Sequence, residues 1–305
     1  MVVVLAAGHG LPPDGPSPRR GVLFGRQNPM IGTIPGPLVV VGATGTVGMR
    51  VVEQAMAAGR RTTAVANDAE ALDRLRARHG ATLTTLYADI RSDAAAADLA
   101  ARLRTLPGPA PGAVIAAIRG AAGSQRVLDA PADFLRRRLD EDLLPHLAIA
   151  RHLLPLLATR PRAGYVLVGG PGADHPWSGY GHHSIGASAL RMLARVLHEE
   201  ARTLPVRVQM LAVDSPMRCD ANAAHARAQW PDVEAIADHA LRLVDGAANA
   251  DIALVRFPLG AAVRPPGLSD DLDVGPCAPI PRHQEDASAL LHRLATSVSA
   301  QESRS

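Results

Sequence analysis

The chain has no lysine among its 305 residues, so arginine carries all of its permanent side-chain positive charge. This absence excludes Schiff-base chemistry on a lysine and a Walker-type phosphate loop, which needs one. Aromatic residues make up only 3%, so a core has to be built from Ala, Val, Leu and Ile. No apolar run reaches the roughly 18 residues that a membrane helix needs, and we predict no membrane partner.

Cysteine is scarce as well, and neither Cys219 nor Cys277 belongs to a metal or redox motif. Two free thiols indicate a reducing compartment. The first residues are apolar but follow no basic segment, which is a poor secretion signal, so we predict a cytoplasmic protein. The formal net charge is only +3, and arginines alternate with acidic residues in a way typical of solvated helix faces. We therefore predict no nucleic-acid partner.

Short apolar runs alternate with helical patterns through the middle of the chain. This β-α rhythm predicts a Rossmann-type α/β fold, a doubly wound parallel sheet with helices on both faces. We expect strands at 37–41, 62–66, 84–87, 113–118, 165–168, 206–213 and 252–257. We expect helices at 47–58, 69–79, 94–106, 132–158, 184–202 and 233–244, the fourth of them bent at Pro145 and Pro155.

Proline and glycine mark the borders of this pattern. We interpret residues 1–36 as an N-terminal tail, 37–260 as a single domain and 261–305 as a Pro-rich C-terminal extension with a short helix near 286–296.

A glycine-rich turn directly follows the first predicted strand and opens a helix. It reads Gly42-Ala43-Thr44-Gly45-Thr46-Val47-Gly48. Glycine allows a tight turn and lets backbone N–H groups approach a pyrophosphate at the helix N-terminus. The alternative is a turn needed only for close packing of helix on strand. After the second predicted strand come Asn67 and Asp68, which do not distinguish NAD from NADP.

The chain resembles the short-chain dehydrogenase/reductase (SDR) family over about residues 38–258. The resemblance rests on the glycine turn, on Tyr87-Ala88-Asp89, on LLPLL at 153–157 and on the block 164–213. The first fifty residues of this matched region are also similar to the NmrA-like branch of the superfamily. The resemblance implies an NAD(P) cofactor whose pyrophosphate lies on Gly42, Gly45 and Gly48 and whose adenine contacts Asp89.

The same resemblance implies that the usual catalytic residues are replaced. The family uses Ser, Tyr, a Lys four residues after the Tyr, and a supporting Asn. Alignment on LLP (153–155) and Ala189-Leu190 puts His183 at the Tyr position, Ala187 at the Lys position and Asp142 at the Asn position. The Ser position falls near Gly170. The family's Asn-Asn-Ala-Gly after the fourth strand becomes residues 117–120, AIRG.

The segment 174–184, which borders the substrate pocket in the family, is rich in polar side chains. A histidine can act as a general acid or base near neutral pH, and Asp142 can orient His183 as a carboxylate orients an imidazole elsewhere. Tyr180 is a second candidate proton donor, and His182 is a further candidate catalytic residue. A metal site made of His175, His182 and His183 is a weaker idea, so we predict no metal. The simplest alternative is that His183 caps a helix and Asp142 pairs with an arginine.

Three functions remain open at this point. The first, which we favour, is a non-redox acid–base catalyst (isomerase, dehydratase or cyclase type) acting on a small organic substrate. The Ala- and Arg-rich composition is typical of GC-rich bacteria, where specialised metabolism is a natural setting. The second is an NAD(P)-dependent oxidoreductase with substituted catalytic residues. The third is a non-catalytic dinucleotide sensor or partner protein. The resemblance implies a homodimer or homotetramer through the helices at 132–158 and 184–202.

Overall fold

A computed structural model of the chain describes residues 36–120, 123–176 and 179–259. These residues build one sheet in the order β3-β2-β1-β4-β5-β6-β7, and each neighbouring pair is parallel. The strands are β1 Leu38–Val41, β2 Thr62–Ala66, β3 Leu83–Tyr87, β4 Ala113–Ala116, β5 Ala163–Gly169, β6 Val206–Ala212 and β7 Leu254–Arg256. The order reverses beside β1, which is the topology of a Rossmann-type doubly wound sheet. The predicted fold class is confirmed.

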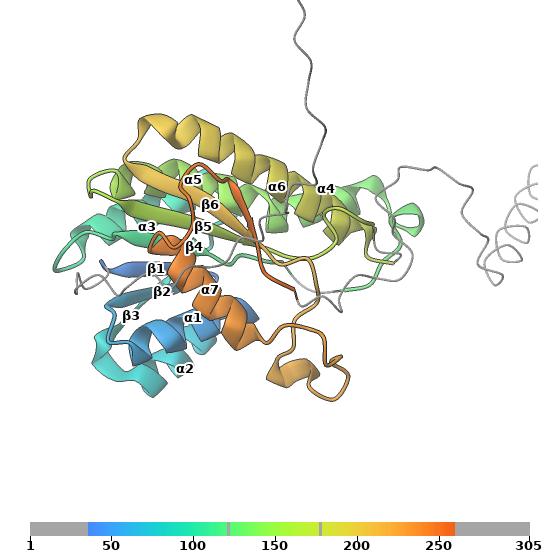
Figure 1. The fold of residues 1–305 in the computed structure, drawn as a ribbon, viewed down its shortest axis with the longest axis horizontal. Helices are drawn as coiled ribbons and strands as arrows, with labels where there is room; N and C mark the ends of the chain where they lie inside the picture. The colour runs from blue at the N-terminus through green and yellow to red at the C-terminus, as the bar shows by residue number, and fades with distance from the viewer. Residues whose placement is uncertain (1–35, 121–122, 177–178, 260–305) are drawn as a thin grey trace, which may run out of the picture.

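Helices cover both faces of this sheet, so the molecule has three layers (Figure 1). They are α1 Thr46–Ala57, α2 Ala69–His79, α3 Asp93–Thr105, α4 Ala132–Asp142, α5 Leu144–Leu157, α6 Gly181–Glu200 and α7 Val233–Val244. One core cluster joins the sheet to α3, α5 and α6, and the other joins it to α1, α2 and α7. Strands β1, β2, β4 and β5 are buried along their whole length, because helices cover both of their sides.

The predicted long helix over 132–158 is in fact two helices. Helix α4 ends at Asp142, and α5 begins at Leu144 with Pro145 in its first turn. Proline has no N–H, and its ring clashes with the carbonyl group four residues earlier, so the first turn of a new helix suits Pro145 better than the interior of a longer one. Pro155, in contrast, lies inside α5 without ending it. The break matters because it places Asp142 at a helix end, beside the loop that follows β4.

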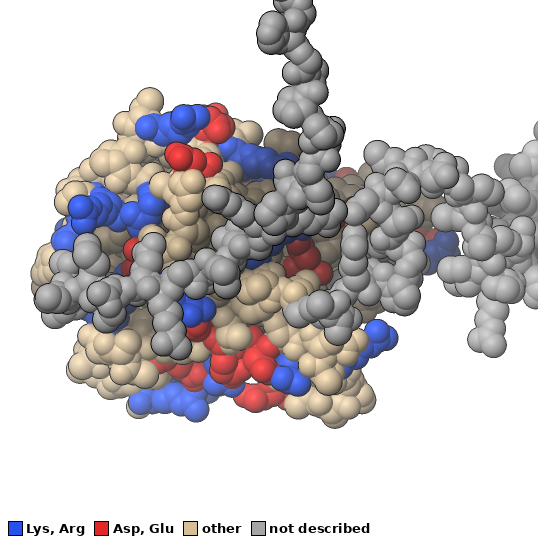
Figure 2. All heavy atoms as spheres, viewed as in Figure 1, with Lys and Arg blue, Asp and Glu red and all other residues tan. Residues whose placement is uncertain are grey.

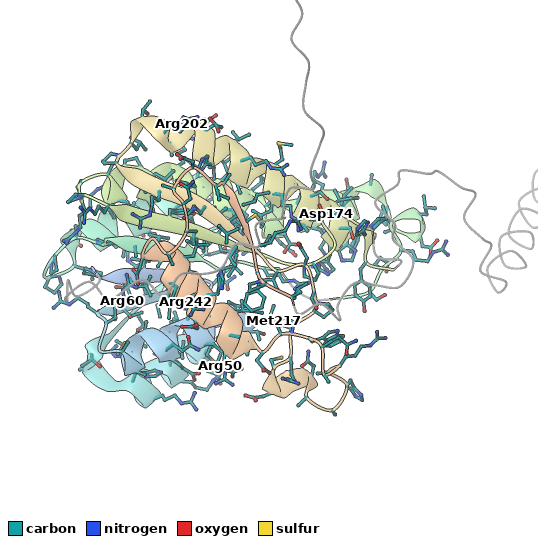
Figure 3. All side chains as sticks on the ribbon, in the orientation of Figure 1. Arg50, Arg60, Asp174, Arg202, Met217 and Arg242 are labelled. Carbon is teal, nitrogen blue, oxygen red and sulfur yellow. The ribbon has the colours of Figure 1, made fainter. Side chains whose placement is uncertain are left out.

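A segment after β6, residues 213–232, crosses to the α1 and α7 side of the sheet. Arg218 and Asp232 close it with two side-chain hydrogen bonds of 2.5 and 2.8 Å. Arg50 of α1 pairs with Asp220 of this segment at 2.5 Å and with Glu234 of α7 at 3.1 Å. Figure 3 shows Arg50 on α1 and Met217 in the segment. Arg50 is therefore occupied by carboxylates.

Charges of both signs are interspersed over the surface. On the part of the face in Figure 2 that grey atoms leave uncovered, arginines lie beside acidic side chains and form no single basic field. Within the described ranges, no helix combines the length and apolarity needed to cross a membrane. The predicted tails lie outside the described residues, apart from residue 36, and so do the helix near 286–296 and Cys277.

Candidate active site

The glycine turn lies at the carboxyl end of β1, where the first turn of α1 begins. Gly42 has φ +80, and a Cβ atom there would lie 2.4 Å from the carbonyl oxygen of Ala117. A Cβ atom on Gly48 would lie 2.1 Å from the carbonyl oxygen of Gly42. Packing of turn, helix and neighbouring strand therefore requires glycine at these two positions, whatever the turn binds.

The outer part of the same turn fits a dinucleotide pyrophosphate. Gly45 and Thr46 are exposed, and Thr44 is half-buried. Helix α1 has no side chain capping its N-terminus and no acidic residue in its first turn. Its first N–H groups, together with the positive end of the helix dipole, are therefore free to bind an anion. Val47 is buried and can contribute only its backbone N–H.

The predicted adenosine contacts are engaged within the protein. Asp68 caps α2, its side chain accepting a hydrogen bond of 2.9 Å from the N–H of Ala71. Asp89 accepts one of 2.8 Å from Nε of Arg91, and this hydrogen bonding holds the pKa of Asp89 below its ordinary value. The contact between Asp89 and adenine stays a prediction.

His183 and Asp142 come together at the carboxyl edge of the sheet. Nδ1 of His183 lies 3.9 Å from Oδ2 of Asp142, and both side chains are largely buried, at 9% and 14% exposure. This distance is too long for a hydrogen bond, but it is an ion-pair distance once the imidazole is protonated. The other oxygen, Oδ1, accepts a hydrogen bond from the backbone N–H of Gly120. In the described part of the chain, no arginine pairs with Asp142, and no side chain caps α6.

Burial and the neighbouring positive charges favour the neutral form of His183. Burial is the largest cause that lowers its pKa, and the positive charge of Arg119 is the next. His182 and Arg138 act in the same direction, whereas Asp142 raises the pKa. Since the ordinary value is 6.5, His183 is neutral at pH 7 and ready to accept a proton.

The other predicted site residues lie on either side of this imidazole. The Tyr180 ring stacks on His183 with 6.1 Å between ring centroids. His182 is buried, with its ring 4.1 Å from that of His183 and edge-on to Phe134 at 5.0 Å. His175 is exposed, and Ser178 lies outside the described residues. Across the described ranges, no three His, Cys, Asp or Glu side chains are arranged to hold a metal ion.

Two residues of this site, Arg119 and His146, were not predicted. His146 is completely buried on α5, where Nε2 donates to the carbonyl oxygen of Ile118 at 3.2 Å. Burial lowers the pKa of His146 to about 4. Arg119 follows Ile118, and its Nη1 lies 3.7 Å from the position that a Cβ atom would take on Gly170. An arginine inside the AIRG segment was a readable signal, whereas His146 lies in an ordinary leucine-rich helix.

One and two turns beyond His183 on α6 lie Ala187 and Arg191. Arg191 is buried, and its guanidinium donates to both Asp174 and Asp214. Arg256, at the end of β7, pairs with the same two carboxylates. Asp174 lies in the loop after β5, on the α6 side of the sheet (Figure 3). Arg191 thus belongs to a four-membered ion-pair cluster through its two terminal nitrogens, Nη1 and Nη2.

A family model described as short chain dehydrogenase matches residues 37–228. The chain belongs to the short-chain dehydrogenase family. No curated protein matches it. The family and the fit of the glycine turn agree with the predicted NAD(P) cofactor.

Solved structures of this family share the fold at low sequence identity. A short-chain type dehydrogenase/reductase from Mycobacterium ulcerans is 19% identical with a TM-score of 0.64, covering 72% of this chain and 87% of that one. Serine dehydrogenase complexed with NADP+ is 17% identical with a TM-score of 0.65, covering 77% and 99%. An NADPH-bound short chain oxidoreductase from Pseudomonas aeruginosa PAO1, which contains an atypical catalytic center, is 19% identical with a TM-score of 0.64, covering 75% and 98%. At these identities the likeness shows the fold alone.

Proposed function

We propose that this short-chain dehydrogenase family member is an enzyme in which His183 transfers a proton to or from a small organic substrate. The observation that supports it is the pairing of a neutral, largely buried imidazole with the Asp142 carboxylate, at 3.9 Å, on the edge of the sheet where the glycine turn also lies. In open α/β sheets, ligands bind at this edge.

In this pair His183 is the base, and the Asp142 carboxylate faces the other nitrogen of its ring. When Nε2 of His183 takes a proton from the substrate, the ring becomes positively charged and Nδ1–H faces Asp142. The carboxylate stabilises that imidazolium and fixes its orientation. Return of the proton from Nε2 to another substrate atom completes an isomerisation, and its return to a leaving hydroxyl completes a dehydration.

A non-redox reaction is our first candidate because α6 offers no free cation beside His183. Ala187, one turn on, has a methyl group, and the guanidinium of Arg191 is taken by Asp174 and Asp214. Neither of these two α6 residues can take the part that the family's lysine plays toward the nicotinamide ribose. Acid–base work by His183 needs no such contact.

Our second candidate is an NAD(P)-dependent oxidoreductase. The exposed Gly45 and Thr46 and the uncapped α1 favour it, since they are suited to a pyrophosphate. A bound nicotinamide would exchange a hydride with the substrate, and His183 would exchange the proton with the substrate oxygen. A non-catalytic dinucleotide sensor is the third candidate, and only the glycine turn supports it.

Deuterium exchange distinguishes these candidates. We would incubate the purified protein with small-metabolite mixtures in D2O, with and without NADP(H) and NAD(H), and identify altered compounds by mass spectrometry. For the first candidate we expect conversion that consumes no nicotinamide and falls by about a hundredfold or more in His183→Ala. His79→Ala, at the far end of α2, is the matched control. Conversion that requires stoichiometric NAD(P)H oxidation selects the second candidate, and turnover unaffected by His183→Ala excludes both.

We also propose a homodimer or homotetramer in the cytoplasm. The oligomer is supported by large apolar side chains exposed on α5 and α6, namely Leu144, Leu147, Ile185, Met192 and Val196. The location is supported by the free thiol of Cys219.

A further inference from the structure

The loop after β4 is held on both sides of Arg119. Before it, the carbonyl oxygen of Ile118 accepts a hydrogen bond of 3.2 Å from the buried His146. After it, the backbone N–H of Gly120 donates to Asp142. Both anchors come from the junction of α4 and α5. The backbone of Arg119 is therefore fixed by the same carboxylate that faces His183.

The Arg119 side chain extends from this fixed backbone across the candidate site. Its Nη1 lies 3.7 Å from the Cβ position of Gly170, just after β5. The positive charge of Arg119 also lowers the pKa of His183. A guanidinium thus extends from the end of β4 toward the end of β5, on a backbone held by the carboxylate that faces His183.

Arg119 differs from the other arginines at this end of the sheet. Arg191 and Arg256 are bound to Asp174 and Asp214, and Arg218 is bound to Asp232. No hydrogen bond or ion pair joins Arg119 to another of the residues that the structure describes, and its side chain is exposed. In the first turn of α6, both ring nitrogens of the buried His182 have no hydrogen-bond partner in this part of the chain. An exposed guanidinium that no carboxylate of the described residues occupies can bind an anionic ligand.

We infer that Arg119 binds the carboxylate of a small-molecule substrate and thereby holds the substrate's acidic proton against His183. A guanidinium presents a planar fork of N–H donors that fits a carboxylate bidentately. The inference rests on the proposed proton transfer at His183 for its purpose, but not for the anion site itself. It names the substrate class, an organic acid with an exchangeable proton close to its carboxylate.

Carboxylate binding at Arg119 also prepares the base. The free guanidinium disfavours protonation of His183, and a bound carboxylate neutralises that charge. His183 then becomes more basic only when a substrate of the right class is present. Asp142 and Arg138 remain in place, so the change comes from the ligand alone.

The test uses acetate as probe and acetamide as its uncharged counterpart, titrated into the full chain. The readouts are the NMR signals of the Arg119 side-chain N–H and of the Gly120 amide. We expect saturable shifts with acetate and none with acetamide. Arg119→Gln should weaken acetate binding, read at Gly120, by about tenfold or more, since it removes a charged hydrogen-bond donor. Arg136→Gln, which changes an exposed arginine of α4, is the matched control and should bind acetate as the wild type does.

Two results overturn the inference. The first is equal acetate affinity in the wild type and Arg119→Gln. The second is loss of acetate binding when ADP is added to saturation, because competition would mean that Arg119 serves the cofactor's phosphates instead. The proposed function fails separately. Arg119-dependent acetate binding in a protein whose turnover survives His183→Ala leaves the anion site standing and removes the proton-transfer role.

Discussion

Oδ2 of Asp142 lies 3.9 Å from Nδ1 of His183, while Oδ1 of the same carboxylate accepts the N–H of Gly120. One side chain thus links the loop after β4 to the first turn of α6. Its position depends on the break between α4 and α5, which ends α4 at Asp142. The site is consequently organised by a helix end and not by a single long helix.

The charges around His183 predict opposite effects of two substitutions on its pKa. Asp142→Asn removes the charge that raises the pKa, so the pKa should fall further below 6.5. Arg119→Gln removes a charge that lowers it, so the pKa should rise. His182 and Arg138, which also lower it, are unchanged in both variants. NMR titration of the ring measures both pKa values. Shifts in the same direction would contradict the arrangement of charges described above.

Burial of His146 predicts loss of stability in acid. Its pKa is about 4 in the folded chain, against 6.5 ordinarily, so only the unfolded chain binds the proton between these values. The stability from neutral His146 is complete above pH 6.5 and is lost as pH falls toward 4. This difference corresponds to about 3 kcal/mol.

The variant that tests it is His146→Gln, which keeps an N–H for the carbonyl oxygen of Ile118 but does not titrate. Urea unfolding at pH 7 and pH 4 should show about 3 kcal/mol less acid destabilisation than in the wild type. His225→Gln, at an exposed position, is the control and should keep the wild-type profile. An unchanged pH dependence in His146→Gln would refute the assignment.

The glycine turn predicts that two of its glycines serve folding and one serves binding. Gly48→Ala would put a methyl group 2.1 Å from the carbonyl oxygen of Gly42, and we expect it to cost about 3 kcal/mol or more. At Gly45 the nearest atom is 3.3 Å away, so Gly45→Ala should fold with a loss near 1 kcal/mol yet weaken NADP(H) binding, because the methyl group meets the phosphate.

Urea unfolding and calorimetric titration of the same two variants separate these effects. Gly59→Ala is the control. It should be strained by about 1 kcal/mol at φ +70 and bind cofactor normally. Wild-type affinity in Gly45→Ala would show that the turn serves packing alone.

The ion-pair cluster predicts very different costs for its two arginines. Arg191 has 6% side-chain exposure and Arg256 has 57%. Arg191→Met removes the buried guanidinium that donates to Asp174 and Asp214. We expect the free energy of unfolding to fall by about 3 kcal/mol. Arg256→Met should cost less than about 1 kcal/mol, and high salt should reduce that cost. Urea unfolding at low and high salt measures both, and equal costs would contradict the difference in burial.

Most of the fold was predictable because its signals are local. Apolar runs such as LVVV and AVIA mark buried parallel strands, and the glycines after β1 mark the turn. The convergence of His183 and Asp142 was predicted only through the family resemblance, since 41 positions separate them in the sequence. Arg119 and His146 were missed because their roles depend on how α5 packs beneath the loop after β4. The boundary at Leu143 was missed because the leucine stripe of 132–158 continues across it.

The exposed apolar side chains of α5 and α6 predict an oligomer that one charge can dissociate. Met192 is 56% exposed on α6, and Val196 lies one turn further on. An apolar surface of this kind on two adjacent helices is stabilised when a second copy covers it. Met192→Arg should therefore sediment as a monomer while the wild type sediments as a dimer or tetramer. Leu128→Arg is the matched control, because Leu128 is 90% exposed and lies on neither helix. A monomeric wild type, or an unchanged oligomer in Met192→Arg, would place the interface elsewhere or remove it.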